Sequence, residues 1–103
     1  MIDVSKCNSQ ASKLEDAATN IDSIIKIFED SYYTLNTSSS TSVKSFKTDI
    51  NAKISILEQL KSDLRAAAST IRTKAQEIYN RQKAEEEARK RAEEEARQQN
   101  QNQ

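Results

Sequence analysis

The chain has 103 residues, of which 31% are charged and 35% hydrophobic, and it contains neither glycine nor proline. This length allows one small domain, and the missing turn-forming residues together with abundant helix formers exclude a β-rich fold and predict an all-α protein. The 16 basic and 16 acidic residues cancel to a net charge of zero, which argues against a nucleic-acid partner because phosphate binding requires a concentrated basic surface.

The N-terminal segment, MIDVSKCNSQ, lacks the basic region and apolar run of a secretory signal peptide. No apolar run approaches the roughly 20 residues of a membrane-spanning helix. We therefore expect a cytoplasmic chain without membrane insertion, and any export must follow a signal-peptide-independent route. The single Cys7 cannot form an internal disulfide. We expect it to be a small buried hydrophobe, with an intermolecular bridge or a reactive thiol as alternatives.

The first apolar pattern predicts a helix over residues 3–35, with Asp3 as its N-cap. Apolar side chains follow one another at alternating spacings of three and four residues, which is an unbroken heptad stripe. The a positions are Val4, Ala11, Ala18, Ile25 and Tyr32, and the d positions are Cys7, Leu14, Ile21, Phe28 and Leu35. Small residues fill the early half of this stripe, so closer helix packing is expected there.

Residues 36–42, NTSSSTS, separate this stripe from the next one. Asn, Ser and Thr side chains compete for backbone hydrogen bonds and so favour turns and caps over helix interiors. We expect the first helix to end near Asn36, which tolerates a left-handed terminal conformation. Thr41 or Ser42 can cap the restart. An antiparallel hairpin is predicted rather than one continuous rod.

The second helix is predicted over residues 43–83. Its a positions are Val43, Ile50, Leu57, Leu64, Ile71 and Ile78, and further apolar support comes from Phe46, Ile54, Leu60, Ala67, Ala68 and Ala75. Lys53 and Lys74 fall at d positions, and Ile54 and Ala75 take over one position later. The apolar stripe is therefore wider and less strict than in the first helix, as in a helix that faces more than one neighbour.

Residues 84–103 form a charged extension with no apolar side chain larger than Ala. Its Glu-to-basic pairs at i,i+4 favour a helix even without tertiary packing. We expect this helix to be a solvated extension, with a charged binding site for a receptor as the alternative. The pairs are Glu85–Arg89, Glu86–Lys90, Glu87–Arg91 and Glu93–Arg97. The final QQNQNQ is expected to be a disordered tail.

The predicted architecture is an antiparallel two-helix hairpin over residues 1–83 with a charged helical extension over 84–103. Residues 1–35 carry 3 basic and 6 acidic side chains, whereas residues 36–83 carry 9 basic and 4 acidic ones, and opposite charges suit antiparallel pairing. A hairpin buries only one side of each stripe and is expected to be marginally stable alone. Pairing with another hairpin into a four-helix bundle would remedy this.

Nothing in the sequence forms a catalytic constellation, because the chain has no His, no Gly-rich loop and no Ser paired with a base. A non-enzymatic protein without cofactor or metal is predicted. The aromatic side chains Tyr32, Tyr33 and Phe46 gather around the turn. They either plug the end of the hairpin or form a docking knob for a partner. Tyr79 stands alone at the end of the apolar pattern, as core edge or recognition residue.

Two segments carry a resemblance to a known family: TSVKSF, Thr41 to Phe46, which restarts the helix, and TIRTKAQEIY, Thr70 to Tyr79, near its end. Over residues 3 to 83 the chain resembles the small helical-hairpin proteins of Gram-positive type VII secretion, the WXG/ESAT-like superfamily. It is most similar to the glycine-free accessory proteins encoded beside LXG toxins. The turn lacks the Trp-x-Gly of the main substrates, and Tyr79 is followed four residues later by Lys83 where their secretion signal has Asp or Glu.

The resemblance implies a targeting partner or chaperone that binds the helical N-terminal domain of a larger toxin, or a second small helical protein, and promotes export. Tyr79 is the implied secretion-signal residue. The predicted partner-binding residues are the larger apolar ones of both stripes: Ile21, Ile25, Phe28, Tyr32, Leu35, Val43, Phe46, Ile50, Leu57, Leu60, Leu64 and Ile71. The alternative is a structural homodimer, a self-paired four-helix bundle from which the charged extension projects.

Overall fold

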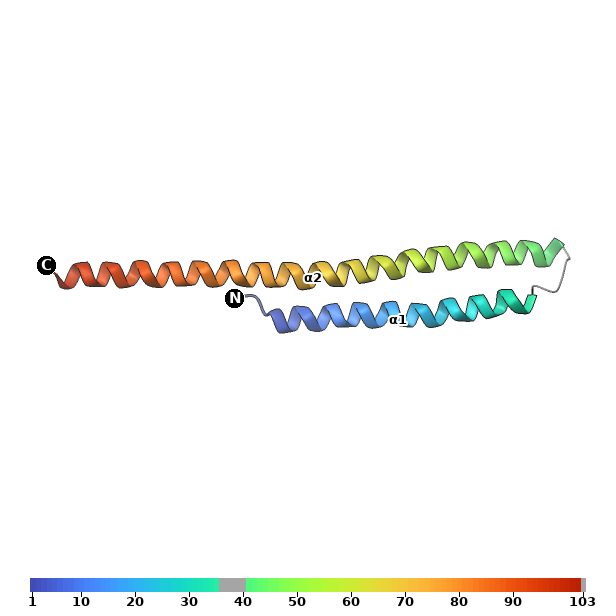
Figure 1. Ribbon diagram of the computed structural model, residues 1–103, viewed down its shortest axis with the longest axis horizontal. Helices are drawn as coiled ribbons and strands as arrows, with labels where there is room; N and C mark the ends of the chain where they lie inside the picture. The colour runs from blue at the N-terminus through green and yellow to red at the C-terminus, as the bar shows by residue number, and fades with distance from the viewer. Residues whose placement is uncertain (36–40, 103) are drawn as a thin grey trace.

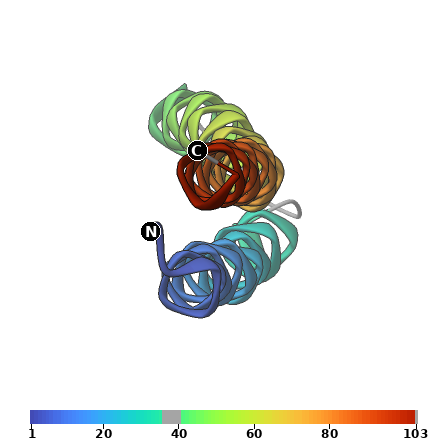
Figure 2. The ribbon, with the colours of Figure 1, turned by 90° about the vertical axis from the view of Figure 1, so that its left-hand side faces the viewer.

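The computed structural model describes residues 1–35 and 41–102 and contains two helices, α1 (Val4–Leu35) and α2 (Thr41–Gln101). They run antiparallel, side by side (Figure 1), and the described residues contain no strand. Figure 2 shows the two helices from one end, where they lie next to each other in a single layer. The predicted all-α hairpin is confirmed.

Helix α1 begins where its N-cap residue was predicted. The backbone N–H of Lys6 donates to Asp3 Oδ1 at 3.0 Å, and the N–H of Cys7 donates to the Asp3 carbonyl at 3.1 Å. Asp3 therefore satisfies one of the N–H groups that the first helical turn leaves without a partner. The start of α1 is fixed by this local chemistry.

Helix α2 begins at Thr41, two residues earlier than predicted. The rest of the predicted turn, residues 36–40 including Asn36, lies outside the described residues. Thr and Ser are acceptable in the first turn of a helix, because side-chain oxygens can accept hydrogen bonds from its N–H groups.

Helix α2 is also longer than predicted, since it continues without a break from the hairpin through the charged extension to Gln101. The tail expected to be disordered is therefore helical over residues 98–101. Gln has a good helix propensity, and these 103 residues contain no Gly or Pro that would interrupt the helix. With 61 residues against 32 in α1, α2 projects well beyond its partner and gives the molecule a length of 95 Å (Figure 1).

Contacts at two levels define the antiparallel register of the helices. At the N-terminal end of α1, the N–H of Ile2 donates to Gln82 Oε1 at 2.8 Å. Farther along, Asp22 of α1 contacts Lys61 of α2. This register brings the acidic first segment beside the basic part of the second, as the charge distribution predicts.

The seam between the helices is built from small residues in one half and larger ones in the other. The contacts across the seam place Ala11 near Ala75 and Ala18 near Ala68 along the helix pair. All four side chains are at most 2% exposed. Alanines on both helices allow their backbones to approach closely, as the sequence predicts for this half. Toward the turn the buried residues are Ile21, Ile25 and Ile50.

The face of α2 that meets α1 differs from a strict a/d stripe. Ala68 and Ala75 are buried, and Ile54 is half-buried. These residues follow the d positions by one. The d residues Phe46 and Leu60 are exposed instead. Because Lys53 and Lys74 occupy the same d column, rotating α2 to bury it would bury two lysines as well. The column that begins one residue later therefore faces α1.

Isoleucines of α1 provide a matched test of this seam. Ile25 is 4% exposed, whereas Ile27 on the same helix is 65% exposed. We expect Ile25→Ala to lower the free energy of unfolding by about 2 to 5 kcal/mol, because it removes buried methyl groups and leaves a cavity. Ile27→Ala should change it by less than about 0.5 kcal/mol. Urea denaturation followed by circular dichroism measures both values, and equal losses would contradict the observed seam.

Candidate protein-binding surface

The seam between α1 and α2 has two edges of different character. Asp22 and Ile24 are two residues apart on α1, so the helical repeat places them on opposite sides of the buried Ile21–Ile25 stripe. Asp22 faces charged side chains of α2, whereas Ile24 lies beside apolar ones. We call these sides the charged edge and the apolar edge.

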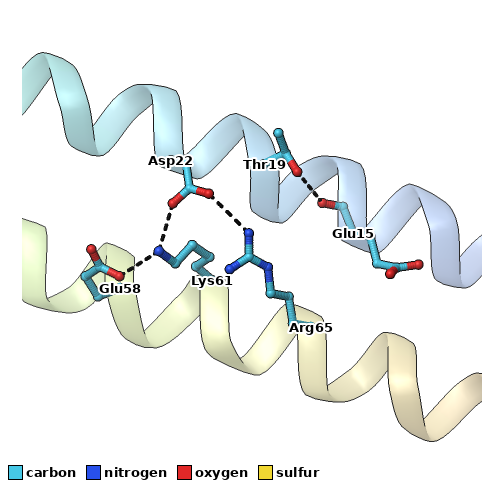
Figure 3. A network of polar contacts seen from close by, with 6 residues as sticks. All are labelled: Glu15, Thr19, Asp22, Glu58, Lys61 and Arg65. Atoms are coloured by element: carbon cyan, nitrogen blue, oxygen red, sulfur yellow. Dashed lines mark hydrogen bonds and ion pairs between the residues drawn. The ribbon is translucent and has the colours of Figure 1, made fainter.

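The charged edge is centred on Asp22 (Figure 3). Lys61 Nζ donates to Asp22 Oδ1 at 2.7 Å and Arg65 Nη2 to Asp22 Oδ2 at 3.1 Å. Lys61 Nζ also lies 2.8 Å from Glu58 Oε2 on its own helix. One α1 carboxylate thus receives two α2 cations, and these paired contacts favour one register of the two helices.

These contacts shift the pKa values of Asp22 and Lys61 in the directions that favour their charged forms. The hydrogen bond from Lys61 holds the pKa of the Asp22 carboxyl below its usual value, with a smaller contribution from Arg65. The hydrogen bonds to Asp22 and then to Glu58 raise the pKa of the Lys61 ammonium. The Lys61 side chain is 18% exposed, so its methylene stem also covers part of the seam.

The charged edge continues toward the N-terminal end of α1. Arg72 of α2 forms an ion pair with Glu15, and its Nη2 donates to Ser12 Oγ at 3.0 Å. The Thr19 hydroxyl donates back to the Glu15 carbonyl at 3.2 Å (Figure 3). Ser12, Glu15 and Thr19 are thus engaged either across the seam or within their own helix, so this part of the charged edge has its contacts within the hairpin.

The apolar edge contains a groove lined by Ile24 and Phe28 of α1 and by Lys53, Ile56 and Leu57 of α2. We call this the apolar groove. Ile24 is 42% exposed and Ile56 is 67% exposed, and Leu60, one turn beyond Ile56, is 45% exposed. Large apolar side chains exposed singly are ordinary, whereas a contiguous group drawn from two helices marks an interaction surface. The apolar edge is therefore the candidate binding surface.

The structure divides the predicted partner-binding residues into three groups. Ile21, Ile25 and Ile50 are buried in the seam, so they are not accessible while the hairpin is closed. Half-buried residues follow: Phe28, Tyr32, Leu35, Val43, Leu57, Leu64 and Ile71. Phe46 and Leu60 are exposed. Of the whole set, Phe28 and Leu57 line the apolar groove.

Sequence reasoning missed Ile24 and Ile56 as candidate binding residues. Each immediately precedes a residue of the heptad stripe, Ile25 and Leu57 respectively, and a strict a/d assignment leaves such neighbours out. The available signal was the width of the stripe, since large apolar residues just outside a and d extend a coiled-coil seam into a second contact face.

The aromatic residues near the turn play different parts. The Tyr32 and Tyr33 rings meet edge to face, with centroids 6.1 Å apart, and Lys47 Nζ lies 5.4 Å from the Tyr32 ring centroid. Tyr32 is thus half-buried and engaged with α2, whereas Tyr33 and Phe46 are exposed. Tyr32 fits a structural part. Of the two exposed rings, Phe46 shares a heptad column with Leu60 and extends the apolar edge, whereas Tyr33 lies on the opposite edge, beside Ile54.

Tyr79 is half-buried near the N-terminal end of α1, and Cys7 is half-buried with a free thiol. In the charged extension, Glu86 and Lys90 lie within ion-pair distance at 3.3 Å. Within the described residues, neither helix contains a stretch long and apolar enough to cross a membrane.

Comparison of the chain with protein-family models, with curated proteins and with solved structures found no match.

Asp22→Asn tests the charged edge, with Asp16→Asn as control because Asp16 forms no ion pair among the described residues. At neutral pH and low salt we expect Asp22→Asn to lower Tm and Asp16→Asn to leave it nearly unchanged. Added salt should reduce the difference between wild type and Asp22→Asn. Thermal unfolding followed by circular dichroism measures Tm.

The Tm difference between wild type and Asp22→Asn should disappear at strongly acidic pH. The folded-state pKa of Asp22 is lowered, so its stabilising contribution is present above the unfolded-state pKa of about 3.9 and is lost as the pH falls through the folded-state pKa. The folded-state pKa of Lys61 is raised, so its contribution is present below about pH 10 and is lost above it. A Tm difference that persists unchanged to strongly acidic pH would contradict the assignment.

Proposed function

We propose that this chain is a non-enzymatic binding partner that covers an apolar surface of another helical protein and completes a four-helix bundle with it. The observation that carries this proposal is the apolar groove and its extension to Leu60, which the hairpin leaves exposed beside its own seam. Covering such a surface is favourable by about 25 cal/mol for each Å² of apolar area removed from water.

The contacts at the two edges determine which side of the hairpin a helical partner can pack against. The ion pairs of Asp22 and Glu15 engage the charged edge within the hairpin, so a docking helix there would have to displace existing contacts. On the apolar edge a helix can lie along α1 and α2 and bury Ile24 and Ile56 together. A second helical hairpin supplies apolar stripes of the required length, which a small ligand does not.

For the particular partner, we propose the helical N-terminal domain of a type VII secretion effector of the LXG toxin class. The proposed role is to bind that domain stoichiometrically in the cytoplasm and promote export of the toxin. This assignment rests on the resemblance of the segments at Thr41–Phe46 and Thr70–Tyr79, and on the hairpin architecture that such partners share. A self-paired homodimer is the alternative occupant of the same edge.

Ile56→Asp tests the binding surface, with Ser55→Asp as matched control on the adjacent exposed position. Each chain is co-expressed with the tagged helical domain of the LXG toxin encoded nearest to its gene. We expect Ile56→Asp to weaken binding by roughly 30-fold or more, because it replaces a large apolar contact with a carboxylate that must lose water in the complex, at a cost of at least about 2 kcal/mol. Ser55→Asp should co-purify as the wild type does.

The substitution is made at Ile56 rather than Ile25, since Ile25 is buried in the seam and a carboxylate there would destabilise the hairpin itself. Circular dichroism checks that both variants keep the helical content of the wild type. Undiminished co-purification of a folded Ile56→Asp chain would contradict the proposed surface, and a stable homodimer of the wild type would favour the alternative.

Tyr79→Ala tests the export role separately from binding. Tyr79 lies at the end of the hairpin away from the turn, whereas the groove residues lie toward the turn. We expect Tyr79→Ala to reduce secretion of the toxin while the complex still co-purifies, with Tyr33→Ala as the control aromatic substitution. Secretion is measured by immunoblotting of culture medium. Equal secretion by the Tyr79→Ala and wild-type strains would exclude Tyr79 as part of the export signal.

A further inference from the structure

Lys53 is the one charged residue among the side chains that line the apolar groove; the others are Ile24, Phe28, Ile56 and Leu57. Among the residues that the structure describes, no carboxylate lies within ion-pair distance of Lys53, and this includes Asp49 one turn earlier. In the free hairpin water solvates the exposed ammonium. Any protein that covers the groove must remove part of that water.

Burying a charged group is unfavourable unless the partner supplies an opposite charge or the side chain escapes to the rim. A lysine at a single core position of a coiled coil therefore selects partner and register at some cost in stability. Lys53 occupies such a position, because it belongs to the d column that would face a second hairpin packed on the apolar edge.

The register of the d column makes self-pairing unfavourable. Phe46 and Leu60 lie seven residues before and seven residues after Lys53, and both are exposed. If two copies paired antiparallel through this column, Phe46 of each would meet Leu60 of the other, and the two Lys53 side chains would meet at the symmetry axis. Like charges placed directly opposite each other in an interface are destabilising.

We propose that Lys53 is a specificity determinant of the apolar edge, which disfavours pairing of two copies and selects a helical partner with a carboxylate side chain at the facing core position. This inference rests on the proposed function and adds the chemistry of the partner to it. The matching partner surface is an apolar helical stripe interrupted by one Asp or Glu. A second copy of this chain presents a lysine at that point and is rejected.

The test uses the chain itself as probe, in sedimentation velocity at low salt. Four samples are compared: wild type, Lys53→Leu, Lys53→Glu, and an equimolar mixture of wild type with Lys53→Glu. We expect wild type and Lys53→Glu to be monomeric when alone. Lys53→Leu should dimerise at least about tenfold more tightly than wild type, because it completes the apolar column. The mixture should form a heterodimer, since Lys53 then meets a carboxylate.

Added salt distinguishes the heterodimer of wild type with Lys53→Glu from the Lys53→Leu dimer. The heterodimer of the mixture should weaken as salt is added, whereas the Lys53→Leu dimer should not, because screening acts on the ion pair alone. Lys26→Leu is the control, an equal change at an exposed lysine that does not line the groove. It should remain monomeric.

Two results would overturn the inference. One is a wild-type dimer as tight as that of Lys53→Leu. The other is that the Lys53→Leu sample and the mixture both remain monomeric. Failure here is distinguishable from failure of the proposed function. If Ile56→Asp abolishes toxin binding but the Lys53 samples behave like wild type, the surface is correct and the role of Lys53 is wrong.

Discussion

Two helices packed against each other can bury only one face of each, and this limit determines which apolar side chains of the hairpin stay on the surface. Helix α2 carries more apolar columns than one partner can cover. The column containing Ile54, Ala68 and Ala75 faces α1, and the column containing Phe46 and Leu60 does not. The exposed apolar edge is a direct consequence, and both the proposed binding role and the proposed selectivity depend on it.

Electrostatics complements this packing by distinguishing the two edges of the seam. Asp22 receives Lys61 and Arg65 on one edge, so that edge has its contacts within the chain. The other edge has Lys53 among apolar side chains. Lysines at the d positions of α2 therefore favour the column that faces α1, and Lys53 is proposed in addition to set the charge that a docking partner meets. Neither effect requires a catalytic group or a cofactor.

Much of this architecture could be predicted from the sequence because its causes are local. The heptad spacing of α1, the cap at Asp3 and the opposite charges of the two segments each follow from residues close together in the chain, and the structure confirms them. The exposed members of the surface were harder to predict. Whether Ile24 or Ile25 is buried depends on the rotation of α1 about its axis. The rotation of α2 decides in the same way between Ile56 and Leu57. That rotation is decided jointly by the alanines of both helices and by the lysines of α2. The length of α2 was underestimated because composition alone does not show where a helix without a stop signal ends.

The proposed partner covers the apolar edge and leaves the charged edge open. Isoleucine methyl NMR tests it most directly, since Ile56 lines the apolar groove while Ile54, two residues earlier, lies beside Tyr32 and Tyr33 on the other edge. In the complex with the helical domain of an LXG toxin, we expect intermolecular nuclear Overhauser contacts from the methyl groups of Ile24 and Ile56 and none from Ile54. Contacts from Ile54 without contacts from Ile56 would show that the partner covers the charged edge instead.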